Sequence, residues 1–166
     1  MDIELKELTK DDGREVYDML QEIVSGENGF QNKAYGLTYK EYKDYLSDNF
    51  DMAKGIGLKP EYVPQTIYWF YIDGKVVGMA KLRHYLNDLL KEIGGHIAYA
   101  IRPEERGKGY GKKLLNELLK KAKDKEIEKV LLTCDDDNYA SRKIIEANGG
   151  ELSKINNGEC KYWIIL

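Results

Sequence analysis

The fold is decided by the stretch Ile101-Arg102-Pro103-Glu104-Glu105-Arg106-Gly107-Lys108-Gly109-Tyr110-Gly111. It follows an apolar run, 96–102, that is typical of a strand, and it leads into a segment with apolar residues at helical spacing. Three glycines in five residues let the backbone approach a bound group closely. The N–H groups and positive dipole end of the following helix point to the same place. Together with the positive charges of Arg106, Lys108 and Lys112, the stretch predicts a cradle for a phosphate or pyrophosphate.

The composition predicts a soluble globular protein with one domain across residues 1–166. Of the 166 residues, 42% are apolar and 33% are charged, and a chain of this length buries a substantial core. The net charge of −3 does not favour nucleic acid as a partner. No run approaches the roughly 20 apolar residues of a membrane span, and the start of the chain lacks a signal-peptide pattern. We therefore expect a cytoplasmic protein with no membrane partner.

The two cysteines, Cys134 and Cys160, fit no spacing that is typical of a metal site, so we expect no metal. In a reducing compartment both residues would be free thiols without a chemical role. A disulfide between them is the alternative that the sequence leaves open.

Hydrophobic periodicity predicts the element order β-α-α-β-β-β-α-β-α-β-β. Asp73-Gly74 marks a hairpin between two β-rich runs, Pro103 ends a strand, and Gly149-Gly150 ends the last helix. The segment 86–92 is expected to be a helical turn or a loop. About seven strands and about four helices make this an α/β chain of the α+β type. The strands are expected near 3–8, 66–72, 75–85, 96–102, 129–134, 151–155 and 161–166, and the helices near 16–23, 38–53, 110–122 and 138–147.

Spacing excludes two common phosphate-binding loops. A dinucleotide-binding loop needs G-x-G-x-x-G, and Lys112 stands where the third glycine should be. A P-loop needs G-x-x-x-x-G-K-[ST], and Lys113 stands where a hydroxyl would bind magnesium. The pattern that fits is R-x-x-G-x-G, formed by Arg106, Gly109 and Gly111.

At these residues the chain resembles the GNAT superfamily of acetyl-CoA-dependent N-acetyltransferases. The stretch from Ile101 to Gly111 is similar to the family's acyl-CoA signature, and the helix opened by Asn138-Tyr139-Ala140-Ser141 after a buried strand is a second match. The run from Leu82 to Tyr99 also resembles a less-characterised bacterial branch. The resemblance implies a mixed, mostly antiparallel sheet with helices on both faces. It also implies acetyl-CoA as co-substrate, with no metal.

The same resemblance implies a set of cofactor-binding residues. Backbone N–H groups from Gly107 to Lys112 would bind the pyrophosphate, and the strand before the loop would pair with the pantetheine arm. Asn138 would reach the pantetheine, although an N-cap of the following helix explains this residue equally simply. The implied residues are Ala100, Ile101, Arg106, Gly107, Lys108, Gly109, Tyr110, Gly111, Lys112, Asn138 and Ser141.

The catalytic residues are less well defined by the sequence. His96 is the best candidate for the base, because an imidazole titrates near neutral pH. His96 and Ile101 are an odd number of residues apart, so a regular strand points them to opposite faces unless a bulge intervenes. A histidine with a purely structural role at a strand start is the alternative, and His84 and Glu92 are weaker candidates. Ile145 stands where family members carry a tyrosine acid, so Tyr139, Tyr99 or a water would replace it.

The sequence gives the least information about the acceptor. A small or amino-acid-like primary amine is expected, and a protein N-terminus or lysine is the alternative. Tyrosines and acids in the first half of the chain would suit a cationic amine, unless these tyrosines form core and the acids a solvated helix face. Rival functions are a non-catalytic CoA sensor on the same fold and a phosphate-loop nucleotide binder. The last strands could also pair in a homodimer. The tyrosines and acids that would suit a cationic amine are Tyr35, Tyr39, Tyr42, Tyr45, Tyr62, Tyr68, Tyr71, Glu41, Asp44, Asp48 and Asp51.

Overall fold

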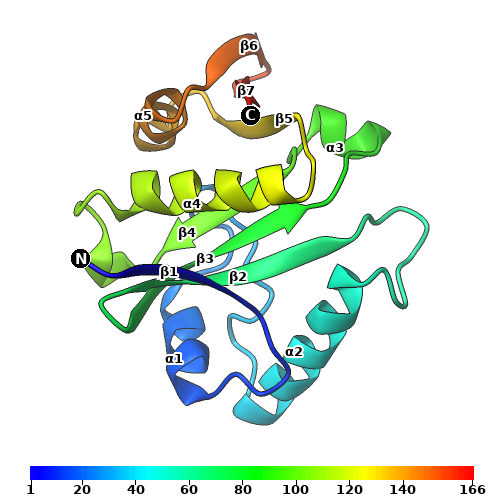
Figure 1. Cartoon of the computed structure of the whole chain (residues 1–166), viewed down its shortest axis with the longest axis vertical. Coiled ribbons are helices and arrows are strands. Elements are labelled where there is room, and N and C mark those ends of the chain that lie inside the picture. The colour runs from blue at the N-terminus through cyan, green and yellow to red at the C-terminus, as the bar shows by residue number, and fades with distance from the viewer.

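Two antiparallel sheets form the centre of the computed structural model, which describes residues 1–166 (Figure 1). The four-stranded sheet has the order β1-β2-β3-β4, and the three-stranded sheet has the order β5-β7-β6. All seven predicted strands are therefore confirmed. Their bounds are β1 Ile3–Glu7, β2 Gln65–Ile72, β3 Lys75–Arg83, β4 Ile97–Ile101, β5 Lys129–Asp135, β6 Glu151–Asn156 and β7 Glu159–Ile165.

Five α-helices accompany the strands, one more than the sequence predicted. The additional helix α3 falls in the segment expected to be a helical turn or a loop, and it forms because the Asn87 side chain accepts a hydrogen bond from the Leu90 N–H at 2.9 Å. Two short 3-10 turns are also present. One lies in the long loop between α1 and α2, and the other lies between β4 and α4. The helices are α1 Arg14–Glu22, α2 Tyr39–Ala53, α3 Asp88–Glu92, α4 Tyr110–Asp124 and α5 Tyr139–Ala147, and the turns are η1 Glu27–Gly29 and η2 Pro103–Glu105.

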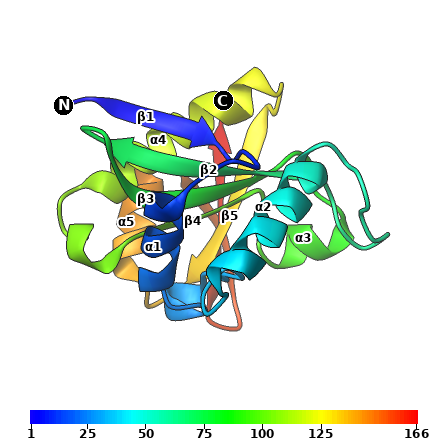
Figure 2. The same cartoon turned by 90° about the horizontal axis from the view of Figure 1, so that it is seen from below.

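Helices cover both faces of the four-stranded sheet. α1 and α2 lie on one face, and α4 lies on the other, beside the second sheet and α5 (Figures 1 and 2). Leu114, Leu115 and Leu118 place one stripe of α4 in a core shared by both sheets. Each of these fully buried leucines contributes about 1.5–3 kcal/mol of transfer free energy. Coverage of both faces also explains why strand β2 is buried along almost its whole length.

The two sheets meet at one point and then diverge. The His96 N–H donates to the Leu131 carbonyl at 2.8 Å, and the Leu131 N–H donates to Nδ1 of His96 at 2.9 Å. Beyond this contact β4 pairs only with β3, and β5 pairs only with β7. The mixed sheet expected from the sequence is thus two antiparallel sheets joined at the start of β4. We call the His96–Leu131 contact the vertex.

Gly95 permits the close approach at the vertex. Its φ is +62°, and a Cβ at this position would lie 2.4 Å from the Leu131 carbonyl oxygen. A side chain would therefore meet backbone that cannot move without separating β4 from β5. Arg83 braces the same turn, because its Nη1 donates to the Gly95 carbonyl at 2.9 Å.

The hydrogen bond at the vertex fixes the protonation of His96. Since Nδ1 accepts from Leu131, the neutral ring carries its proton on Nε2, and a proton on Nδ1 would oppose the Leu131 N–H. The residue is 6% exposed. Burial lowers the pKa of His96 to about 4, and the positive charge of Arg83 adds to the effect.

Replacing Gly95 by alanine is expected to destabilise the protein more than replacing its neighbour Gly94. Both residues have positive φ, so each alanine costs about 1–2 kcal/mol of backbone strain. At Gly94 the new Cβ would meet side chains alone, the end of Arg83 at 3.2 Å and Leu90 at 3.6 Å. At Gly95 the clash with the Leu131 carbonyl should cost a further 1–3 kcal/mol, roughly. Urea unfolding measures both values, and equal losses would contradict the close approach described here.

The vertex also predicts a pH dependence. The pKa of His96 is lower in the folded chain than its unfolded value of about 6.5, so its stabilising effect is complete above that value. The effect is lost as the pH falls from about 6.5 toward 4. Between pH 7 and pH 5 the wild type should lose about 2 kcal/mol more unfolding free energy than His96→Leu.

His96→Asn is the matched control, since its side-chain oxygen can still accept from Leu131. It should be more stable than His96→Leu at pH 7 and share the flatter pH dependence. Urea unfolding at both pH values tests this, and an unchanged slope in the leucine variant would refute the assigned protonation.

Candidate functional site

A cavity of about 720 Å³ occupies the space between the diverging sheets. Its walls come from the loop around η1, residues 23–31 (the η1 loop), from β3 and β4, from residues 106–111 (the glycine loop), and from β5 and α5. Most of the predicted cofactor-binding residues line it, whereas Lys108, His96 and Tyr139 do not. The predicted residues in the wall are Ala100, Ile101, Arg106, Gly107, Gly109, Tyr110, Gly111, Lys112, Asn138 and Ser141.

The glycine loop presents free backbone donors to this cavity. Gly107 and Gly109 have φ values of +78° and +79°, and a Cβ at either position would meet nothing within 4 Å. The N–H groups of Gly107, Lys108 and Gly109 have no backbone acceptor. Helix α4 begins directly afterwards at Tyr110, so the N–H groups of its first turn add to the set. The arrangement suits a polyanion such as a pyrophosphate.

Gly111 has a different task from the other two glycines. A Cβ at Gly111 would lie 2.8 Å from Cδ1 of Ile144 in α5. The glycine therefore lets the start of α4 approach α5, and it shapes the wall of the cavity by closing the gap between these helices.

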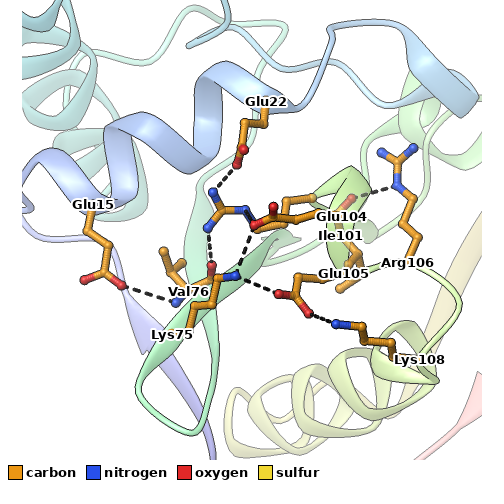
Figure 3. Close-up of polar contacts among 10 residues, drawn as sticks. Glu15, Glu22, Lys75, Val76, Ile101, Glu104, Glu105, Arg106 and Lys108 are labelled. Carbon is orange, nitrogen blue, oxygen red and sulfur yellow. Dashed lines mark hydrogen bonds and ion pairs between the residues drawn. The ribbon is translucent and has the colours of Figure 1, made fainter.

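Lys108 and Arg106 of the loop are already paired with carboxylates, and Figure 3 shows the pair of Lys108 with Glu105. Lys108 and Lys75 bind the two oxygens of Glu105 at 2.7 Å and 2.8 Å, and these hydrogen bonds lower the pKa of Glu105 to about 2. Arg106 donates through Nε to the Ile101 carbonyl at 2.9 Å and through Nη1 to Glu27 at 2.5 Å. Arg106 thus ties the end of β4 to the η1 loop. Among the predicted cations in the cavity wall, Lys112 alone has no carboxylate partner.

The facing edges of β4 and β5 also contribute polar backbone. Because neither strand has a second neighbour, the backbone groups on one edge of each strand are left without a strand partner. A linear amide-bearing group could pair with the β4 edge near Ala100 and Ile101 as an added strand would. Asn138 stands across the cavity as the N-cap of α5, since its side chain accepts from the Ser141 N–H at 3.2 Å.

Tyr99 and Tyr139 are the two tyrosines considered as proton donors, and of these Tyr99 alone lies in the cavity wall. The Tyr99 hydroxyl lies 3.5 Å from Oγ of Ser141, and burial raises its pKa to about 12. Tyr139 is 66% exposed and stands outside the wall. Ile145, at the position where related enzymes carry a tyrosine, is buried in the core shared by both sheets. From the sequence, Tyr99 was only an alternative to Tyr139, because the residue pattern does not show which tyrosine ring faces the cavity.

The sequence candidates for a base stand outside the cavity wall. His96 forms the vertex with Leu131, and its low pKa keeps it neutral at physiological pH. Nε2 of His84 lies 2.8 Å from the Thr66 hydroxyl, and Glu92 pairs with Lys161 at 3.2 Å. These three residues are therefore engaged in structural contacts, and none of them lines the cavity.

The far end of the cavity differs from the acidic and aromatic wall considered from the sequence. Tyr42, Tyr45 and Tyr68 are buried core residues, and the acids of α2 are absent from the lining. Lys81 and Arg83 line this end instead. A sequence signal for Lys81 exists, since it is a lone lysine inside the apolar run 76–82, but a basic residue near a strand end is ordinarily solvated.

The structure contains no cluster of three or more side chains of the types that commonly bind metals. None of its helices combines the length and the apolar character that a membrane span requires.

Solved structures share this architecture. RimL, a ribosomal L7/L12 α-N-protein acetyltransferase in complex with coenzyme A, has a TM-score of 0.72 and 16% identity, with 99% of this chain and 94% of that chain covered. The N-acetyltransferase PseH of Campylobacter jejuni, in complex with acetyl coenzyme A, has a TM-score of 0.66 and 12% identity, with 98% of each chain covered. The microcin C7 self-immunity acetyltransferase MccE, in complex with acetyl-CoA and AMP, has a TM-score of 0.68 and 16% identity, with 99% and 92% covered. At these identities the likeness concerns the fold.

No curated protein is significantly similar to this sequence. Residues 20–149 match the family described as the acetyltransferase (GNAT) family, which is most of the chain. This match and the shared fold confirm the resemblance drawn from Arg106, Gly109 and Gly111, so the chain belongs to the GNAT family of acetyltransferases.

Proposed function

We propose that the protein is an acetyl-CoA-dependent N-acetyltransferase that transfers acetyl directly to the primary amine of a small, amino-acid-like acceptor. The observation that carries the proposal is the set of free N–H groups in the glycine loop, at Gly107, Lys108 and Gly109, of which Gly107 and Gly109 line the cavity between the diverging edges of β4 and β5. Acetyl-CoA, when bound, supplies an acetyl thioester. The protein's part is to hold it, orient the amine and manage protons.

The residues of the wall fit the parts of such a co-substrate in order. The pyrophosphate would accept from the loop N–H groups, with Lys112 as the free cation beside them. The pantetheine amides would pair with the β4 edge at Ala100 and Ile101, and the Asn138 and Ser141 side chains would face them from α5. A backbone N–H of β4 near Ile101 would stabilise the charge that develops on the acyl oxygen.

The transfer forms one C–N bond and breaks one C–S bond. The amine loses a proton and the departing sulfur gains one. We assign the second proton to Tyr99, because its hydroxyl is in the wall and its high pKa keeps it protonated at neutral pH. Tyr139 is the other predicted donor, but its ring is directed to solvent.

His96 is assigned a positioning role in place of general base. It holds the vertex at which β4 and β5 are joined and from which they diverge, and so it would set the width of the slot in which the thioester would lie. Because the ring is neutral, it places no second positive charge beside Arg83.

Acetyl-CoA and CoA are expected to raise the melting temperature of the protein, whereas ATP should not. Gly109→Leu should weaken CoA binding at least tenfold, or about 1.4 kcal/mol, because the new side chain would project into the pyrophosphate position. Gly57→Leu is the matched control, since Gly57 also has positive φ and open space around it but lies outside the cavity. Stabilisation by ATP alone, or full CoA affinity in Gly109→Leu, would contradict the proposal.

Tyr99→Phe should lower kcat by about 100-fold or more while leaving the affinity for CoA unchanged, because the leaving sulfur loses its proton donor. Tyr139→Phe removes the same hydroxyl from an exposed ring and should leave kcat within about twofold. Both variants are measured by release of free thiol from acetyl-CoA with a panel of amines. The opposite pattern would transfer the role to Tyr139, and tight CoA binding without turnover of any amine would favour a CoA sensor.

A further inference from the structure

Lys81 is a buried cation without a counter-charge. It belongs to β3, lies opposite Ala98 of β4, and is 9% exposed. Its Nζ donates to the Gln31 carbonyl at 2.5 Å and lies 5.0 Å from the centre of the Phe30 ring. No carboxylate lies within ion-pair distance. Burial, with the nearby positive charges of Arg83 and Lys33, lowers its pKa to about 8, so the ammonium form still predominates at neutral pH.

Arg83 stands beside Lys81 on the same face of the sheet. Met79, Lys81 and Arg83 alternate along β3, so all three face the side that α1 and α2 cover. The guanidinium of Arg83 reaches the Gly95 carbonyl at 2.9 Å, and it also forms no ion pair. Both side chains line the cavity. Two cations are thus held at one end of a cleft without an acid beside them.

None of the acids of the cavity wall forms an ion pair with Lys81 or Arg83. Glu27 binds Arg106, and Glu105 binds Lys75 and Lys108. Asp135 and Glu159 belong to β5 and β7, on the opposite wall. Burial of unpaired charge is costly, and it is retained where a ligand supplies the missing partner. The missing partner of Lys81 and Arg83 is therefore an anion.

We propose that the acceptor carries a carboxylate, and that Lys81 and Arg83 bind it while the amine points along β4 toward the thioester. The inference rests on the proposed acetyl transfer. The register of β3 and β4 places Lys81 opposite Ala98, two residues from Ala100, which is about 7 Å along the strand. That spacing suits a carboxylate and an amine separated by a few bonds. Asp135 and Glu159 would face the ammonium group on arrival.

The test compares acceptors that differ in one group. α-Amino acids, their α-amides and the corresponding aminophosphonates are supplied with acetyl-CoA, and release of free thiol is followed. Carboxylates should be used at least tenfold better than their amides by kcat/KM, equivalent to about 1.4 kcal/mol. Better use of the phosphonates than of the carboxylates would overturn the choice of a carboxylate, and equal use of the amides would overturn the inference as a whole.

Lys81→Met should remove this preference. It should lower kcat/KM for carboxylate acceptors at least tenfold and change the amides by less than about twofold, with CoA affinity unchanged. Lys43→Met is the matched control, because Nζ of Lys43 also donates to a backbone carbonyl, that of Asp12 at 3.0 Å, and also lies over an aromatic ring, but outside the cavity. An equal loss for both kinds of acceptor in Lys81→Met would contradict carboxylate recognition.

Direct binding separates this inference from the proposed function. Amide NMR shifts around β3 are followed as the same amino acids are added to the wild type and to Lys81→Met. Binding in the wild type that Lys81→Met weakens would support the carboxylate site even if no amine is acetylated. Absence of binding together with absence of turnover would overturn it. Failure of acetyl-CoA to bind would remove the proposed transfer, whereas carboxylate binding at Lys81 would still be observed.

Discussion

The reciprocal hydrogen bonds between His96 and Leu131 are the contact on which the rest of the site depends. They join the two sheets at the start of β4, where Gly95 leaves room for the Leu131 carbonyl. From that point the strands diverge and each keeps one unpaired edge. In a continuous sheet these edges would satisfy one another, and no slot would exist. The backbone and imidazole of His96 thus hold the two walls of the cleft together at one end.

The cleft has two polar ends that work by different means. At the glycine loop the donors are backbone N–H groups, and the nearby Arg106 and Lys108 are neutralised by Glu27 and Glu105. This end offers many weakly charged donors in a fixed geometry, which suits the diffuse charge of a pyrophosphate. At the other end Lys81 offers a full charge in a buried setting. A chain with net charge −3 can therefore place positive groups at both ends of one cavity, because their positive potential is local.

Most of the architecture could be predicted from the sequence, because apolar periodicity and turn residues act locally. The strand before the glycine loop, helix α4 with its leucine stripe and the hairpin at Asp73-Gly74 follow from such patterns, and the structure contains each of them. Helix α3 was harder to predict, because its five residues show too little hydrophobic periodicity and its formation depends on the N-cap Asn87.

The partners of individual side chains could not be predicted in the same way. His96 looked like a base because its ordinary pKa suits proton transfer, but in the fold it is buried and hydrogen-bonded to Leu131, 35 residues away, and burial lowers its pKa. Tyr99 meets Ser141 only when β4 comes to lie beside α5, and Lys81 meets the Gln31 carbonyl only when β3 comes to lie beside the loop that follows η1. Arg106 likewise binds Glu27, a residue 79 positions earlier. Tertiary contacts between distant segments determine these roles, and no local pattern encodes them.

Amide hydrogen exchange with and without acetyl-CoA tests the central claim most directly, since the proposed contacts are made by backbone N–H groups. The account predicts that acetyl-CoA slows exchange at residues 107–112 and along the free edge of β4, with little change in the distant helix α2. Protection confined to α2 or to the β6–β7 hairpin, or no protection at the glycine loop, would contradict it.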